Sequence, residues 1–489
     1  MFRIFSEPKA KPVALKSKEE IKKRYTVLRN LIFLTCYLMY VVSYICRRSL
    51  SMSAPVAFEF GKEDMGIVMG IGAFVYGIGK FVNGILADKG NVRTSLALNT
   101  IMAGAFTGLM TFPIFLSPFD GKNHDFSVCF ACIIWGISNW LHSGIFPYCA
   151  KSLIRWIPNK SRAKWWGIFS SSHELGAFIG TNTAFPVGVF VQRSLGFGGA
   201  ESIFVFPFLI SISVGVIGFF SLKDRPVSVG LPDVEEICGS NLSGGVEKKY
   251  EASEENLTYF QTLKKYVVKS KVIWNLAAIY FFVYIFRECL NNRIFEIIIS
   301  KDVGRNADFT HIIQNQDSVY FSAFSSSVLF LLGFLGTILA PAISEKIFKG
   351  KRAPANFWCL IASALSLIGV WLSISKFSPI SSNEVFQKPL LVACLCIAGF
   401  SICVPQVLVG GVCAVEFSSK KVGAAAVGLI GFVGYIGTTV GHPISGWLMD
   451  FSKEFFGDQS RLALIFWGCA ALFGAICCVP LWNYDVIKK

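Results

Sequence analysis

Residues 27–50 read VLRNLIFLTCYLMYVVSYICRRSL, and residues 272–299 read VIWNLAAIYFFVYIFRECLNNRIFEIII. Each stretch is long enough to cross a bilayer as one helix, which takes about 20 mostly apolar residues. Each also holds the pattern Tyr-x-x-Arg, from Tyr44 to Arg47 in the first stretch and from Tyr284 to Arg287 in the second. The recurrence of this pattern in two apolar stretches indicates an all-α membrane protein built from two repeats.

The composition of the whole chain agrees with this interpretation. Hydrophobic residues make up 53% of the 489 residues and charged residues only 16%, whereas soluble domains carry about 25% charged residues. Such a chain cannot cover a soluble surface of its size, which excludes disordered, fibrous and secreted disulfide-scaffold proteins. The 15 cysteines lie mostly inside apolar stretches and show no metal-ligand spacing, so we expect reduced thiols, no metal site and no cofactor.

Ten further stretches resemble these two in length and polarity, which gives twelve candidate membrane spans. The first six cover residues 27–50, 65–87, 94–116, 127–153, 165–192 and 200–222, and the second six cover residues 272–299, 318–345, 354–376, 388–412, 421–449 and 461–483. An even number of spans places both termini on the same side of the membrane.

Basic residues fix the predicted orientation. The net charge is +15, and the lysines and arginines gather in the N-terminal tail and in alternate short loops, for example Lys89, Arg93, Lys151 and Lys346. By the positive-inside rule these loops and both termini are cytoplasmic. The basic charge therefore serves orientation and contact with anionic lipid, and we expect no nucleic-acid partner.

A long polar connection divides the predicted spans into six plus six. We expect a cytoplasmic tail over 1–26, an N-terminal bundle over 27–222, a cytoplasmic linker over 223–271, a C-terminal bundle over 272–483 and a cytoplasmic tail over 484–489. The acidic stretch 233–256 predicts a flexible segment. After it, Leu257, Phe260, Leu263 and Val267 recur at near-helical spacing and predict a short interfacial helix.

Ionisable residues inside spans are the main indication of function. Arg47, Lys80 and Arg287 would each cost roughly 2.5–3.5 kcal/mol at the centre of a span. A chain retains such residues where they face a hydrated cavity and bind an anion. Arginine suits phosphate because its planar guanidinium donates two parallel hydrogen bonds. One arginine from each half could therefore hold a single phosphoryl group from opposite sides.

Each of these residues also has a structural alternative. Arg47 could lie at the membrane surface, Lys80 could extend to the interface from a packed position, and Arg48 is expected at the interface or in a pair. His173, beside Glu174, could follow the protonation of a bound phosphate or simply pack. Hydroxyl groups that could bind a phosphate or a sugar, or lie in the core, belong to Tyr40, Tyr44, Tyr76, Tyr284 and Tyr435.

Two further patterns concern movement and packing. Asp88 and Arg93 follow the second span and Glu345 ends the eighth, which makes them candidates for a conformational switch at equivalent loops. Glycines recur in the second and eleventh spans, where we expect close helix packing; they are Gly66, Gly70, Gly77, Gly84, Gly423, Gly428, Gly431, Gly434, Gly437 and Gly441.

Several longer motifs resemble those of one known family. The run from Arg47 to Pro55, the segment Tyr76-Gly77-Ile78-Gly79-Lys80-Phe81-Val82 and the segment Val283-Tyr284-Ile285-Phe286-Arg287 are similar to its first, second and seventh helices. The stretch from Asp224 to Pro232 is the most specific match. The chain therefore resembles the organophosphate:inorganic phosphate antiporters of the major facilitator superfamily.

This resemblance implies two six-helix bundles that rock about a central site and no enzyme activity. It implies that Arg47 and Arg287 bind phosphate, with Lys80 and His173 assisting. The sequence departs from the family at Ser49 and Glu174, where asparagine is usual. The implied protein is a monomer in a bacterial cytoplasmic membrane, and its partners are an organophosphate, inorganic phosphate and the lipid bilayer.

Trp165-Trp166-Gly167 is more similar to hexose-phosphate transporters and sensors than to glycerol-3-phosphate carriers. We therefore expect exchange of a hexose 6-phosphate, such as glucose 6-phosphate, for inorganic phosphate. The alternatives are a glycerol-3-phosphate antiporter and a membrane receptor that senses hexose phosphate. A membrane enzyme ranks lowest because no span carries a nucleophile–base pair.

Overall fold

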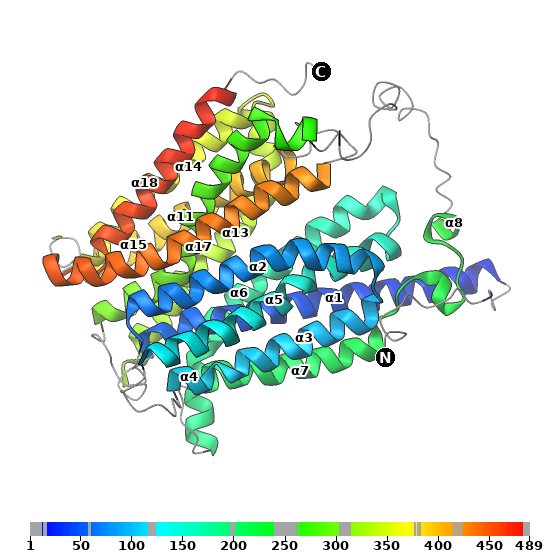
Figure 1. Cartoon of the computed structure of the whole chain (residues 1–489), viewed down its shortest axis with the longest axis horizontal. Coiled ribbons are helices and arrows are strands. Elements are labelled where there is room, and N and C mark those ends of the chain that lie inside the picture. The colour runs from blue at the N-terminus through cyan, green and yellow to red at the C-terminus, as the bar shows by residue number, and fades with distance from the viewer. Residues whose placement is uncertain are drawn as a thin grey trace.

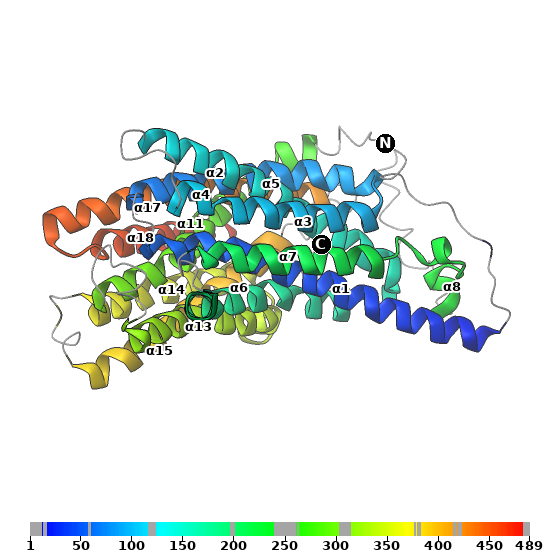
Figure 2. The same ribbon diagram turned by 90° about the horizontal axis from the view of Figure 1, so that it is seen from below.

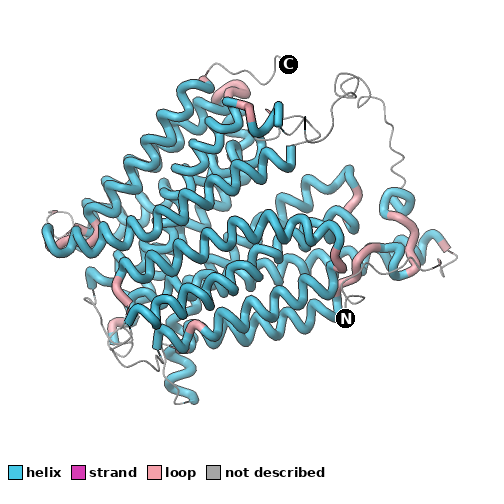
Figure 3. The backbone as a smooth tube through the Cα atoms, viewed as in Figure 1, coloured by secondary structure: helices cyan, strands magenta, loops and turns pink. Residues whose placement is uncertain are grey.

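The computed structural model describes residues 12, 17–56, 60–115, 124–195, 201–238, 261, 264–302, 314–375, 378, 383–413, 417 and 423–482. Within these residues every regular element is a helix (Figure 3). Twelve of the described helices are long and apolar enough to cross a membrane. The prediction of an all-α membrane protein with twelve spans is confirmed.

The first half contributes seven main helical segments, because the third span continues into a short fourth helix. They are α1 (Lys18–Ser53), α2 (Lys62–Lys89), α3 (Val92–Leu109), α4 (Thr111–Phe115), α5 (His124–Trp156), α6 (Asn159–Leu195) and α7 (Ser202–Ser221). The second half contributes α11 (Lys271–Asp302), α13 (Gln316–Ala342), α14 (Arg352–Ile374), α15 (Glu384–Val407), α17 (Gly423–Phe456) and α18 (Arg461–Cys478).

Several helices extend beyond the apolar stretches that predicted them. Helix α1 begins at Lys18, well before residue 27, because its start is capped: the Ser17 hydroxyl accepts the N–H of Glu19 at 3.3 Å. Glu19 and Glu20 in the first turn also suit the positive end of the helix dipole. Hydropathy marks the part of a helix that lies in lipid, so it does not report these polar turns.

The helices form two bundles, one from each half of the chain (Figure 1). Between the bundles, α2 packs against α17 and α6 packs against α13, and α1 also meets α11. The start of α1 and the short helix α8 (Val234–Cys238) lie at the same end of the molecule, here called the linker end (Figure 2). The expected two-bundle architecture is confirmed.

Glycine allows α2 and α17 to approach backbone to backbone. A Cβ at Gly66 would lie 2.6 Å from the carbonyl oxygen of His442, and one at Gly70 would lie 2.8 Å from that of Thr439. The expectation of close packing holds at these two positions. It also holds where a Cβ would lie within 3.0 Å of an atom of another helix, at Gly77, Gly434, Gly437 and Gly441. It is wrong at Gly84, Gly428 and Gly431, whose Cβ would meet no described atom within 4 Å.

The chain after α7 packs against the first bundle. Asp224 is buried, and its Oδ1 accepts the N–H of Val92 at the start of α3 at 2.6 Å. Burial raises the pKa of this carboxyl group. Trp156 Nε1 donates to the carbonyl oxygen of Lys223 at 3.0 Å. Lys223 and Asp224 thus tie the end of α7 to α5 and α3.

The predicted flexible segment over 233–256 is wrong at its start. Residues Val234–Cys238 form α8, and Val234 is buried against the first bundle. The rest of that segment, and most of the predicted interfacial helix with Leu257, Phe260 and Leu263, lies outside the described residues. Val267 is described, and it is buried within a short helical turn over Lys264–Val268.

Candidate functional site

A cavity of about 270 Å³ lies between the two bundles, and both bundles contribute to its wall. This volume is close to the lower end of the range for small-molecule sites, about 300–1,000 Å³. Nine side chains that the sequence marked as candidate binding residues line it: Arg47, Arg287, Lys80, His173, Tyr40, Tyr44, Tyr76, Tyr284 and Tyr435. Residues 240 positions apart in the chain therefore face one space.

The cations on the first bundle lie against aromatic rings. The guanidinium carbon of Arg47 is 4.2 Å from the centre of the Tyr76 ring and 5.1 Å from that of Tyr44. Lys80 Nζ is 5.4 Å from the centre of the Phe146 ring. Such cation–π contacts hold a positive charge without neutralising it. The alternatives that put Arg47 or Lys80 at the membrane surface are not supported.

Arg287, on α11, is held differently because carboxylates surround it. It is 7% exposed. Its Nη1 contacts Glu288 Oε1, and its Nη2 lies 3.7 Å from Oε1 of Glu174, on α6. Its Nε is buried and has no hydrogen-bond partner in the part of the chain that the structure describes. That N–H is therefore an unsatisfied donor in the described structure.

His173 lies next to this carboxylate cluster. Its Nε2 is 3.0 Å from Glu174 Oε1, and its ring centre is 5.5 Å from that of Tyr44. Glu174 therefore lies between an imidazole of its own helix and a guanidinium of the other bundle.

The five tyrosines form ring pairs within each bundle, and the pair of Tyr76 with Tyr435 joins the two bundles. The ring centres of Tyr40 and Tyr44 are 5.3 Å apart, those of Tyr76 and Tyr435 are 5.0 Å apart, and those of Tyr284 and Tyr435 are 5.2 Å apart. Aromatic walls with hydroxyl groups combine apolar contact with hydrogen bonding, as a polar organic ligand requires.

The cavity also contains polar residues that the sequence analysis did not assign to it. Arg48 is paired, as one expectation had it: its Nη1 donates to Asn292 Oδ1 at 2.8 Å and its Nε to Thr181 Oγ1 at 3.2 Å. It also lines the cavity, with Glu288, Asn291 and Gln406. A helical face gives a signal for some of these residues, because Glu288 follows Tyr284 by four positions and Asn291 follows Arg287 by four.

Two of the three candidate switch residues, Arg93 and Glu345, are not among the described residues that line the cavity. Arg93 donates its Nε hydrogen to the carbonyl oxygen of Phe219 at 2.6 Å. Glu345, whose side chain is 64% exposed, pairs with Arg352 at 3.7 Å. The side chain of Asp88 is not among those described. The structure therefore does not bring Arg93 or Glu345 to the ligand cavity, and the role of all three residues in movement stays a prediction.

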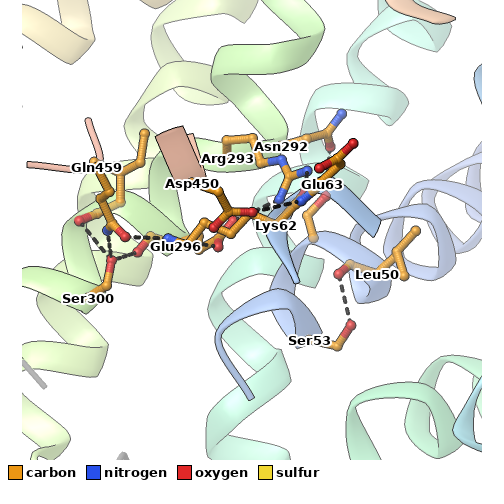
Figure 4. Close-up of polar contacts among 12 residues, drawn as sticks. Leu50, Ser53, Lys62, Glu63, Asn292, Arg293, Glu296, Ser300, Asp450 and Gln459 are labelled. Atoms are coloured by element: carbon orange, nitrogen blue, oxygen red, sulfur yellow. Dashed lines mark hydrogen bonds and ion pairs between the residues drawn. The ribbon is translucent and has the colours of Figure 1, made fainter. Parts of the chain in front are cut away.

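A second cluster of charges joins the bundles (Figure 4). It lies at the start of α2, at the end of the molecule opposite the linker end (Figure 1). Lys62 Nζ, at the start of α2, lies 3.3 Å from Glu296 Oε1 on α11, and Arg293 Nη1 lies 3.0 Å from Glu296 Oε2. Arg293 Nη2 also donates to the carbonyl oxygen of Lys62 at 2.7 Å. Gln459 contacts both Lys62 and Ser300. These groups are called the far-end cluster below.

The sequence profile of the Major Facilitator Superfamily matches residues 36–414. The chain belongs to this superfamily. It is 28% identical to a probable hexose phosphate transport protein of Chlamydia pneumoniae, over 98% of this chain and 96% of that protein. It is 27% identical to the membrane sensor protein UhpC of Salmonella typhimurium, over 100% of this chain and 99% of the sensor.

The fold of this chain is similar to that of a solved transporter structure. The bacterial homologue of the human lysosomal transporter Spinster, in its inward-facing and unoccupied conformation, matches with a TM-score of 0.63 and 16% identity over 94% of this chain and 96% of that chain. At this identity the match concerns the fold alone. The resemblance to the organophosphate branch, which the motifs indicated, is confirmed by the relatives named above.

Proposed function

We propose that this superfamily member exchanges a hexose 6-phosphate, such as glucose 6-phosphate, for inorganic phosphate by alternating access. The observation that carries the proposal is the charge of the cavity. Arg47, Arg48, Lys80 and Arg287 line it together with two carboxylates, those of Glu174 and Glu288. Among these arginine, lysine and glutamate side chains two positive charges remain in excess, and one phosphate dianion would neutralise them.

Exchange follows from the position of these charges. Arg47 and Lys80 belong to one bundle and Arg287 to the other, so one phosphoryl group can contact both bundles at once. Closing the cavity without an anion would bury uncompensated cations, which is costly in a medium of low dielectric constant. A phosphorylated ligand on either side lowers that cost, so the loaded carrier changes conformation more readily than the empty one.

Substrate class and orientation have separate support. The relative from Chlamydia pneumoniae is named a probable hexose phosphate transport protein, and the tyrosine wall and the amides of Asn291 and Gln406 suit sugar hydroxyl groups. We assign the linker end to the cytoplasm because the basic loops of the sequence lie on that side. One chain supplies both sides of the cavity, so a monomer is the transporting unit.

The test is exchange by the purified protein in liposomes loaded with radiolabelled phosphate. We expect external glucose 6-phosphate to drive release of label, glycerol 3-phosphate to drive less, and glucose to drive none. Stronger release with glycerol 3-phosphate than with glucose 6-phosphate would show that glycerol 3-phosphate is the preferred substrate. No release with any phosphorylated compound would overturn the proposal.

A receptor is the second candidate because one relative is named a membrane sensor protein. A receptor would bind glucose 6-phosphate to the same cavity without passing it across the membrane. Saturable binding to the purified protein, together with exchange no faster than in protein-free liposomes, would favour this second function.

A further inference from the structure

Glu174 belongs to the first bundle, and its carboxylate lies beside Arg287 of the second bundle. It lies on α6, is 4% exposed, and its Oε1 is 3.7 Å from Arg287 Nη2 on α11. The same oxygen lies 3.0 Å from Nε2 of His173 on its own helix, and no contact of this oxygen among the described residues has hydrogen-bond geometry, so proximity of charge positions it between His173 and Arg287. A carboxylate in this position resembles a bound anion in both charge and place.

We propose that Glu174 is a built-in counter-ion that holds Arg287 across the bundle interface in the empty carrier and is displaced by the phosphate group of the substrate. This inference rests on the function proposed above. It assigns Glu174 as the residue that restrains the carrier from changing conformation without a ligand.

The surroundings of the two arginines give the first part of the argument. Arg47 contacts tyrosine rings, and no ion pair of Arg47 occurs in the part of the chain that the structure describes. Arg287 already has carboxylates at two of its nitrogens. An entering phosphate therefore meets an uncompensated charge at Arg47 but must compete at Arg287. Competition by an internal anion lowers affinity and eases release, which suits a carrier that must let its ligand go.

The identity of the two carboxylates gives the second part. Glu288 lies beside Arg287 on the same helix, so their contact moves with one bundle as a rigid unit. Glu174 belongs to the other bundle, so its contact with Arg287 links the two bundles and opposes their relative movement. When phosphate fills the site, it replaces Glu174 at Arg287 and removes this restraint. The empty carrier keeps the restraint.

The experiment compares two substitutions that remove the same charge from the same guanidinium. Full-length wild type, Glu174→Gln and Glu288→Gln are reconstituted in liposomes loaded with radiolabelled phosphate, and efflux is followed with and without external phosphate. We expect E174Q to raise efflux into phosphate-free medium by about fivefold or more, the lower end of common coupling factors. We expect E288Q to raise that efflux less than E174Q does, because the pair of Glu288 with Arg287 lies within one bundle and does not couple the two bundles.

Equilibrium binding of phosphate to the detergent-purified proteins gives the second readout. E174Q should bind phosphate more tightly than wild type because its competitor is gone, and Glu174→Asp should fall between the two. Wild-type efflux and wild-type affinity in E174Q would overturn the inference, and so would equal leaks in E174Q and E288Q. If wild type fails to exchange at all, the proposed function fails, whereas the binding comparison still tests the counter-ion.

Discussion

Arg287 is the residue on which the proposed binding of phosphate depends most. It is buried, it retains one unpartnered N–H in the described structure, and it lines the cavity with its counterpart Arg47. A lysine would keep the charge but lose the planar set of donors that fits a phosphoryl group.

We therefore expect Arg287→Lys to lower kcat/KM for phosphate exchange by about 10- to 100-fold, since a hydrogen bond to a charged group is worth about 1.5–3 kcal/mol. Exchange in liposomes measures this effect, and the amount of monodisperse protein after purification reports folding. Arg193→Lys, at an exposed position near the end of α6, is the control and should exchange like wild type. Full activity of R287K would contradict the assigned role.

Asp224 shows a different use of a charged residue, at the start of a helix. Its Oδ1 accepts the N–H of Val92, the first residue of α3, and both residues are buried. Burial raises the pKa of Asp224, which means that its ionised form is less favourable in the folded protein than in the unfolded chain.

At the scale of the element, this contact gives a prediction for α3. Asp224→Ala leaves the Val92 N–H without its partner and should lower the stability of the folded protein by about 1–2 kcal/mol. Asp224→Asn keeps an oxygen acceptor and avoids the burial of a charge, so it should cost less than the alanine. Thermal unfolding in detergent ranks the two variants. An alanine variant as stable as the asparagine variant would show that the contact does not hold the start of α3.

Helix α2 allows a second prediction at this scale, because its glycines face different surroundings. A Cβ at Gly70 would lie 2.8 Å from a backbone oxygen of α17, whereas one at Gly84 meets no described atom within 4 Å. Gly70→Ala should destabilise the protein by about 1–3 kcal/mol through overpacking. Gly84→Ala should be neutral or stabilise it by up to about 1 kcal/mol, because alanine favours helix. Equal unfolding temperatures would refute this account of the interface.

For the whole molecule, the far-end cluster links the two bundles at a second place, away from the cavity. Lys62 and Glu296 come from different bundles, and their side chains are 9% and 5% exposed. Arg352 and Glu345 form a comparison pair within one bundle, and the glutamate there is 64% exposed. Burial decides how much each pair contributes, since exposed pairs are worth about 0–1 kcal/mol and removing one partner of a buried pair costs about 3–5 kcal/mol.

A double-mutant cycle with Lys62→Met and Glu296→Gln should therefore give a coupling free energy above about 1 kcal/mol. The same cycle with Arg352→Met and Glu345→Gln should give a value near zero. Both are measured by chemical unfolding of the purified protein. A coupling at Lys62 and Glu296 as small as that of the exposed pair would mean that the cluster does not hold the bundles together.

Apolar length, loop charge and the repeated Tyr-x-x-Arg were enough to predict the twelve spans and the two bundles, because the bilayer imposes its thickness on every span separately. The same reasoning predicted the cavity residues, since an ionisable group in lipid must face a polar space wherever its helix packs. Each of these inferences concerns a single segment and its solvent, so each could be made before any contact between distant segments was known.

Contacts between distant segments were decided by tertiary structure alone. Nothing near Lys62 in the chain indicates that Glu296 compensates its charge, and nothing near Glu174 indicates that Arg287 does so. The start of α1 depended on the cap at Ser17. The helix over Val234–Cys238 depended on burial of Val234 against the first bundle. Pairing of charges depends on which helix faces meet, and that is fixed only when the two bundles pack together.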